Sequence, residues 1–362
     1  MDTKYTHRLE KIEAVLDQWL PEAPDSAWLE KVFAAPSSTG GSVPLELAES
    51  LTRPGRDLLK RGGKRWRPLL MVLAAECVAG ENGGEAALRL TPLVEIPHNA
   101  SLIHDDIEDN SEERRGKPAV HIKYGTDTAI NTGAFMYFLP LACLSAWKGK
   151  PEIKEQIWTA WASHMRALHL GQAMDIAWHR DFNSLPNLDE YDRMCRLKTG
   201  CLARLAAILG VYSGTEAPGT APEGIALLAD AFGGAAERLG VGFQILDDVK
   251  NLSTGIPGKK RGDDIVEGKK SLPVLLYLHR YPEKREFAAR CFAAARSAGT
   301  DAPEVNEFIN ELEKAGVLDE GHEKALEYIG KSREVFSALE PAGVSLHKEG
   351  RELLTGLVDL LV

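Results

Sequence analysis

Three aspartates follow an apolar stretch of this 362-residue chain. Asp105 and Asp109 are four residues apart, so both would lie on one face of a helix, with Asp106 beside them. Like charges repel, and the C-terminal end of a helix disfavours anions. A divalent cation removes both objections, because Mg²⁺ binds carboxylate oxygens and keeps positions open for phosphate oxygens. The pattern therefore predicts a Mg²⁺ site; a solvated acidic helix end is the alternative.

A second acidic motif has the same layout. Asp247 and Asp248 also follow an apolar helical stretch, and the polar residue Asn251 stands at the last position. Two such motifs far apart in the sequence predict two helices that face one metal-filled cavity. Such a cavity could hold a diphosphate through several Mg²⁺ ions.

Basic residues supply the complementary charge for a diphosphate. Lys64 and Arg67 follow paired glycines, which let a backbone approach a ligand closely. Arg114 and Arg115 follow the first aspartate motif and could donate forked hydrogen bonds to phosphate. His98 precedes Asp105 by two helical turns, and we weigh it equally as a core histidine or a ligand.

A polar loop at 258–270 follows the second motif, with glycines at both ends and lysines between acids. Its composition is also that of a solvated turn. Its position directly after Asp248 favours a mobile lid that closes over diphosphate and metal, with Lys259 and Lys269 among its cations.

The composition favours a mostly helical protein, because Leu and Ala are frequent and runs of β-branched residues are few. A net charge of −10 argues against nucleic acid as a partner. The five cysteines form no CxxC pair, so we expect buried, reduced thiols and a cytoplasmic protein. The longest apolar run, 133–147, contains Pro140 and is expected to be too short for a stable membrane anchor.

Helical periodicity and the absence of a linker predict one large helical domain over 1–362, with an N-terminal helical extension at about 1–45. The expected helices are 4–20, 69–79, 84–109, a helix from 126 through 138, 151–178, 188–213 and 222–250, with several amphipathic helices after 283.

Taken together and in this order, the motifs from 62 to 273 resemble those of the trans-isoprenyl diphosphate synthases, or polyprenyl synthetases. A Gly-Gln-x-x-Asp at 171–175 and a Lys-Thr pair at 198–199 complete the set. The resemblance implies an all-α bundle around a deep central cavity, a homodimer, and about three Mg²⁺ ions. It implies condensation of isopentenyl diphosphate with an allylic diphosphate, which yields a longer all-trans polyprenyl diphosphate and diphosphate.

The resemblance also implies roles for individual residues. Isopentenyl diphosphate would be bound by Lys64, Arg67, His98 and Arg115. The allylic diphosphate would be bound by Arg114, Lys198, Lys259 and Lys269. Metal ions would be held by Asp105, Asp106, Asp109, Asp247 and Asp248. Lys198, Thr199 and Gln244 would face the developing allylic cation, with Asp175 and Asp264 as supports.

Product length is expected to depend on side-chain bulk along the cavity. Ala100 and Ser101 stand about one helical turn before Asp105, and both are small. This favours a product of C20 or longer over farnesyl, although Phe135, Met136 or Phe138 could form a floor.

Two departures from the family pattern stand out. Asn251 replaces a common aspartate, which keeps an oxygen ligand but removes its charge. Ala134 replaces another, for which the sequence offers no interpretation.

Two other functions fit part of the pattern. A terpene cyclase also uses an aspartate-rich helix and Mg²⁺, but it needs no second basic pocket. A non-catalytic partner subunit of another synthase would be expected to lose its acidic motifs.

Overall fold

The computed structural model describes residues 3–33, 44–216, 224–255, 260–338 and 345–361. The chain forms two compact units, and each is described by itself. Unit 1 comprises Met1–Ala162, Leu205–Gly233 and Ser337–Leu360; unit 2 comprises Ser163–Arg204, Gly234–Phe336 and Leu361–Val362. The expectation of one domain over 1–362 stays a prediction.

Helices make up nearly all of the regular structure. Those wholly in unit 1 are α1 (Thr3–Trp19), α2 (Ser26–Phe33), α3 (Leu45–Lys60), α4 (Trp66–Leu88), α5 (Pro92–Glu108), α6 (Val120–Tyr124), α7 (Thr126–Ala146) and α17 (Lys348–Asp359). Those wholly in unit 2 are α9 (Leu188–Cys195), the π-helix η2 (Arg196–Gly200), α12 (Asp263–Glu267), α13 (Leu272–Arg280), η3 (Pro282–Lys284), α14 (Arg285–Ala298), η4 (Gly299–Asp301) and α15 (Pro303–Lys314). Unit boundaries fall within α8 (Pro151–Arg180), α10 (Cys201–Gly214), α11 (Ile225–Ser253) and α16 (Val317–Ala338).

The strands of the described residues are one short antiparallel pair in unit 1. In this pair β1 (Glu113–Arg114) lies beside β2 (Lys117–Pro118). The all-α fold class is therefore confirmed.

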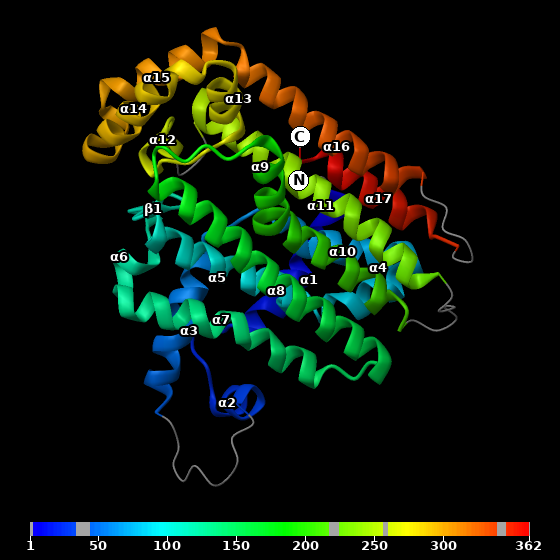
Figure 1. The fold of residues 1–362 in the computed structure, drawn as a ribbon. Coiled ribbons are helices and arrows are strands. Elements are labelled where there is room, and N and C mark those ends of the chain that lie inside the picture. Colours follow the sequence, from blue (N-terminus) through cyan, green and yellow to red (C-terminus); the bar gives the residue numbers. More distant parts are fainter. Residues whose placement is uncertain (1–2, 34–43, 217–223, 256–259, 339–344, 362) are drawn as a thin grey trace. The chain divides into compact units, whose positions relative to one another are not determined.

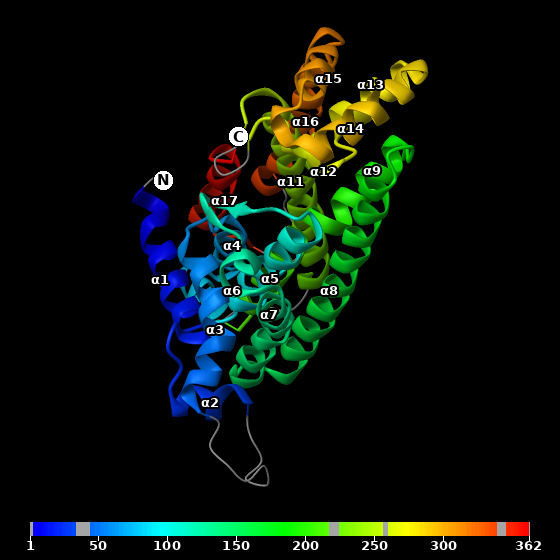
Figure 2. The same cartoon turned by 90° about the vertical axis from the view of Figure 1, so that its left-hand side faces the viewer.

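The core of unit 1 is built around α4 and α5. Helix α4 is buried on every side from Leu69 to Val78, and it packs against α1 and α17. Helix α5 packs along α7 and also contacts α3 and α4 (Figure 2). This packing fixes the helix that carries the first three aspartates.

A proline inside α5 is compensated by a tryptophan from α8. Pro97 has no amide N–H, so the carbonyl of Leu93, four residues earlier, cannot accept the usual helical hydrogen bond. The indole Nε1 of Trp161 donates to this carbonyl at 3.1 Å. The backbone just before His98 is therefore held from outside its own helix.

Unit 2 has an aromatic core of its own. Tyr277, Phe292 and Phe308 are buried together, and the ring centroids of Phe292 and Phe308 are 5.6 Å apart in an edge-on arrangement. These residues lie on α13, α14 and α15, which are grouped in Figure 1. The cluster supports the segment that follows the second aspartate motif.

Most expected helices are present, but one helix break was misplaced. The break expected at Gly80 to Gly84 is a kink at Ala79 and Gly80 inside α4, and the chain leaves the helix only after Leu88. Helix α5 therefore begins at Pro92, eight residues later than expected. The 188–213 helix was expected to be continuous, and η2 interrupts it.

Helix α7 is longer than the apolar run at 133–147 that the sequence indicated. It spans Thr126–Ala146, 21 residues with a mean hydropathy of 1.4 over its most apolar window, and by length and composition could cross a membrane. Core helices of soluble proteins meet the same criterion, and α7 packs against α3, α5 and α6. The absence of a stable membrane anchor stays a prediction.

The cysteines lie as expected. Cys77, Cys143, Cys195, Cys201 and Cys291 are all buried and form no disulfide.

Candidate active site

The first aspartate motif occupies the last turn of α5 in unit 1. Asp106 is completely buried, and Arg114 Nε donates to its Oδ1 at 2.7 Å. Burial raises the pKa of Asp106, and the charge of Arg114 opposes this shift. Arg114 also lies 3.7 Å from Asp105 Oδ2. The arginine thus holds the buried aspartate and partly screens its neighbour.

The half-buried carboxylates of Asp105 and Asp109 fit an open magnesium site better than a site in which the protein supplies every ligand. Among the described residues, no group of three or more His, Cys, Asp or Glu side chains is arranged to hold a metal. Mg²⁺ commonly uses one or two carboxylates and completes its shell with water and substrate phosphates. Asp106 Oδ2 is also buried and accepts no hydrogen bond in the described part of the chain. This donor set suits a metal that arrives with a diphosphate.

The glycine-rich loop before α4 has an unusual backbone. Gly62, Gly63 and Arg65 have φ values of 92°, 137° and 48°. A Cβ on Gly63 would lie 2.8 Å from Arg65 Nη1, so glycine allows this guanidinium its close approach. Lys64 at the loop tip is exposed, whereas Arg67 is buried with its guanidinium carbon 4.5 Å from the centre of the Trp66 ring.

The structure brings Arg67, His98 and Arg115 into one electrostatic cluster. Burial lowers the pKa of His98 well below its usual value, and the charges of Arg67 and Arg115 lower it further. The imidazole is therefore neutral near pH 7. Burial and the nearby Arg65 lower the pKa of Arg115 to about 10. These are three of the four residues expected to bind isopentenyl diphosphate.

In unit 2 a chain of hydrogen bonds joins the Lys-Thr pair to the second aspartate motif. Thr199 Oγ1 donates to Gln244 Oε1 at 2.8 Å, and Gln244 Nε2 donates to Asp248 Oδ1 at 2.9 Å. Lys198 Nζ donates to Asp175 Oδ2 at 2.6 Å. Lys198 and Thr199 lie in η2, and single π-helical turns are frequent at functional sites.

Asp248 is buried at the centre of this network. Its Oδ2 accepts from the hydroxyl of Tyr191 at 2.7 Å and from the amide of Leu272 at 3.3 Å. Burial raises the pKa of Asp248, while the hydrogen bonds from Tyr191 and Gln244 oppose the rise. Asp247 is half-buried on the neighbouring face of α11.

Asn251 is completely buried and shapes the loop after α11. Its Oδ1 accepts from the amide of Asp264 at 3.1 Å, and its carbonyl accepts from the amide of Gly262. This contact uses the oxygen that the sequence suggested as a metal ligand. The side chain of Asn251, which stands where the family commonly has aspartate, therefore holds the first turn of α12.

The lysines of the polar loop have different surroundings. Lys269 is ion-paired with Glu267, whereas Lys259 lies outside the described residues. Lys270 is buried 4.4 Å from the centre of the Phe292 ring. Burial lowers the pKa of Lys270 to about 8.

The pattern of the polyprenyl synthetase family matches residues 48–312. The chain belongs to this family. A short chain isoprenyl diphosphate synthase of Methanothermobacter thermautotrophicus is 32% identical over 317 residues, which cover 87% of this chain and 90% of that protein. A geranylgeranyl diphosphate synthase of Methanosarcina mazei is 31% identical over 82% of this chain and 86% of that protein. The structure of a geranylgeranyl pyrophosphate synthetase from Pyrococcus horikoshii is similar, with a TM-score of 0.78, 27% identity and 99% of each chain covered.

The aspartate motifs of this polyprenyl synthetase lie in different units, Asp105, Asp106 and Asp109 in unit 1 and Asp247 and Asp248 in unit 2. Their action on one diphosphate stays a prediction.

The residues expected to set product length lie in contrasting places. Ala100 is completely buried, and Ser101 is half-buried and donates to the carbonyl of His98. The ring of Phe135 stacks on Phe33 of α2 with centroids 5.9 Å apart. Phe138 is 67% exposed. The roles of these residues in setting product length stay predictions.

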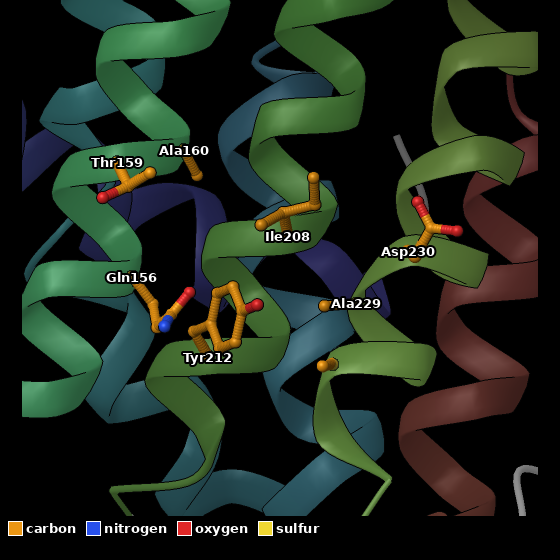
Figure 3. A pocket seen from close by; sticks show the side chains of 8 residues that line it. Gln156, Thr159, Ala160, Ile208, Tyr212, Ala229 and Asp230 are labelled. Atoms are coloured by element: carbon orange, nitrogen blue, oxygen red, sulfur yellow. The ribbon is translucent and has the colours of Figure 1, made fainter.

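A separate cavity of about 210 Å³ opens in unit 1 between α8, α10 and α11 (Figure 3). Gln156, Thr159 and Asp230 contribute its polar groups, with the ring of Tyr212 beside them. None of the predicted site residues lines this cavity, so it is no part of the candidate active site.

Two residues of the site were missed from the sequence. Tyr191 holds Asp248 but stands in a stretch without a recognised chemical motif. Arg65 holds the glycine loop and lies within the Gly-Gly-Lys-Arg-x-Arg-Pro motif, but no role was predicted for it. The helix-capping box at Asn187 and Glu190 was the one local signal near Tyr191, because it marks where α9 begins.

Proposed function

We propose that this protein is a Mg²⁺-dependent trans-prenyltransferase that condenses isopentenyl diphosphate with an allylic diphosphate. Its product is an all-trans polyprenyl diphosphate of C20 or longer, and diphosphate is released. The proposal is supported above all by the cluster of Arg67, His98 and Arg115 together with the aspartates in the last turn of α5. The cluster provides cations for one diphosphate, and the aspartates provide carboxylates for the metal of another.

Product length is supported by the relatives and by the small residues on α5. Geranylgeranyl and geranylfarnesyl diphosphate synthases are among the proteins similar to this chain. Ala100 is buried and small, so it puts no bulky side chain one turn before Asp105.

We assign the binding of isopentenyl diphosphate to Lys64, Arg67, His98 and Arg115. The arginines supply fixed positive charge, and the neutral imidazole of His98 donates one hydrogen bond without adding to the repulsion between them. Lys64, exposed at the tip of its loop, can reach the diphosphate as a flexible point charge.

Asp105 and Asp109 would hold Mg²⁺ on the allylic diphosphate, and Asp247 would do so from α11. When bound, Mg²⁺ neutralises the charge that develops on the leaving diphosphate. We assign Asp106 and Asp248 the further task of holding Arg114 and Gln244, because an oxygen of each buried carboxylate accepts those hydrogen bonds.

The remaining residues act on the allylic carbon chain. The linked side chains of Thr199 and Gln244 present oxygen dipoles that stabilise the developing allylic cation. Lys198, held by Asp175, and Lys269 add positive charge for the departing diphosphate. Water must be kept from the cation, which is the task proposed for the 258–270 loop.

Purified protein tests this proposal directly. We expect release of diphosphate from isopentenyl diphosphate plus an allylic diphosphate, with loss of release when EDTA replaces Mg²⁺. Asp105→Ala should abolish release, whereas Glu108→Gln in the same helical turn should keep most of it. Release by Asp105→Ala at the wild-type rate would contradict the assignment of the metal site.

The same preparation separates the alternatives. A cyclase would release diphosphate without isopentenyl diphosphate, and a non-catalytic subunit would release none with any allylic substrate. We further propose a cytoplasmic homodimer; sedimentation velocity of the purified chain tests the oligomeric state.

A further inference from the structure

Arg65 ties the glycine-rich loop to three neighbouring segments. Its Nη1 donates to the Gly62 carbonyl at 3.1 Å and to Glu95 Oε1 on α5 at 3.1 Å. Its Nη2 donates to the Leu59 carbonyl at 2.5 Å. Its Nε donates to Glu13 Oε1 on α1 at 2.6 Å. The side chain is 4% exposed, so the guanidinium belongs to the protein interior.

This arrangement distinguishes Arg65 from the other basic residues of the loop. Its donors are directed to carbonyls and carboxylates of the protein, so these contacts occupy the guanidinium within the protein. Lys64 and Arg67 stand on either side of it in sequence. The positive φ of 48° at Arg65 sets the path of the backbone between Lys64 and Arg67.

The contacts continue to a second phosphate-binding residue. Glu95 Oε1 accepts from Asn99 Nδ2 at 3.0 Å, and Asn99 Oδ1 accepts from Arg115 Nη1 at 3.4 Å. Arg115 Nη1 also donates to the Gly62 carbonyl, the acceptor that it shares with Arg65. One network therefore joins α1, the loop and Arg115.

Glu13 is the part of this network supplied by the N-terminal helix. Its side chain is 42% exposed, while Arg65 and Glu95 are buried. A second ion pair, between Asp17 and Arg56, joins α1 to α3 and includes no residue of the loop. Glu13 and Asp17 thus both form ion pairs from α1, and of these two Glu13 is the one that contacts a residue of the loop.

We propose that Glu13 is a positioning residue for isopentenyl diphosphate. Through Arg65 it holds the loop in the backbone conformation that presents Lys64 and Arg67 to the diphosphate. The N-terminal helix is therefore a working part of the substrate site. This inference rests on the proposed function, because it assigns a task to the isopentenyl diphosphate site of that reaction.

The test compares Glu13→Ala with Asp17→Asn in the full chain. Glu13→Ala removes a charge-assisted hydrogen bond at a half-exposed group. The dissociation constant for isopentenyl diphosphate, measured by calorimetry, should therefore rise about three- to tenfold. We expect KM for isopentenyl diphosphate to rise equally, with kcat and KM for the allylic substrate nearly unchanged. Hydrogen exchange at amides 62–65 should quicken in the resting protein. Glu13→Gln keeps an acceptor oxygen and should fall between the wild type and Glu13→Ala.

The control decides whether the effect belongs to the loop or to the docking of the whole helix. Asp17→Asn should leave both exchange and affinity as in the wild type. Equal losses in Asp17→Asn and Glu13→Ala, or wild-type affinity in Glu13→Ala, would overturn the inference and leave the proposed function intact. Wild-type protein that neither binds nor consumes isopentenyl diphosphate would overturn the proposed function, and the inference with it.

Discussion

Replacing Tyr191 with Phe removes a single hydroxyl from the interior of unit 2. That hydroxyl donates to Asp248 Oδ2 at 2.7 Å, and both residues are buried. The other partners of Asp248 are Gln244 Nε2 and the amide of Leu272. Phenylalanine fills the same space, so the change deletes the contact without leaving a cavity.

The size of the effect follows from the charge of the acceptor. A buried hydrogen bond to a charged group contributes about 1.5–3 kcal/mol, more than a neutral one. We expect Tyr191→Phe to lower the free energy of unfolding by about 2 kcal/mol. Asp248 also holds Gln244, which in turn accepts from Thr199. A displacement of reacting groups by about 1 Å can cost up to about a hundredfold in rate, so kcat should fall roughly tenfold or more.

Urea unfolding and steady-state kinetics measure the two effects. The matched control is Tyr277→Phe, because the Tyr277 hydroxyl donates at 3.3 Å to Glu311, a longer bond to a more exposed carboxylate. The control should lose less than about 1 kcal/mol and keep wild-type kcat. Equal stability losses in both variants, or wild-type kcat in Tyr191→Phe, would refute the role given to the Asp248 network.

Three further predictions concern product length, packing and pH. Ala100→Phe should shorten the product, as measured by mass, because it fills space one turn before Asp105; an unchanged product would put the floor elsewhere. Gly171→Ala should lower kcat and destabilise the protein by about 1–3 kcal/mol in urea unfolding, because its Cβ would lie 2.4 Å from the Lys198 amide nitrogen; normal kcat would show that η2 tolerates displacement. The pKa of Lys270 is lowered to about 8 from 10.5, so between these pH values the unfolded chain binds more protons. The free energy of unfolding of the wild type, relative to that of Lys270→Met, should therefore rise from pH 8 to 10.5 by at most about 3 kcal/mol. A difference that does not change with pH would show that the Lys270 ammonium is solvated in the folded protein.

Residue types and their order indicated that Arg67, His98 and Arg115 would lie near one another, and their binding of a diphosphate stays a prediction. Arg67, His98 and Arg115 are separated by up to 48 residues, yet they act on one another electrostatically as expected. Their proximity could be predicted because each arginine stands beside a local signal, a pair of glycines or an aspartate-rich helix end.

The boundary between α4 and α5 was predicted wrongly because of its glycines. The sequence predicts a break between two helices at Gly80 to Gly84, but α4 continues through Gly83 and Gly84 to Leu88. A Cβ on Gly83 would lie 2.3 Å from the Ala75 carbonyl oxygen, and one on Gly84 would lie 2.7 Å from Glu76 Oε1. These glycines meet a packing requirement that local sequence does not express.

The long-range contacts could not be predicted from local patterns. Glu13 and Arg65 are 52 residues apart, and Tyr191 and Asp248 are 57 apart. Helical periodicity says which face of a helix is buried, but not which side chain of another helix it meets. Phe135 is a further example, because helical periodicity could not predict that its ring packs on Phe33 of α2.

The mass of the wild-type product tests the central claim most directly. Purified protein would receive Mg²⁺, isopentenyl diphosphate and, in turn, C5, C10 and C15 allylic diphosphates. We predict an all-trans diphosphate of C20 or longer from each primer that is accepted. A product that stops at C15 would contradict the length assigned here, and no elongated product from any primer would contradict prenyl transfer itself.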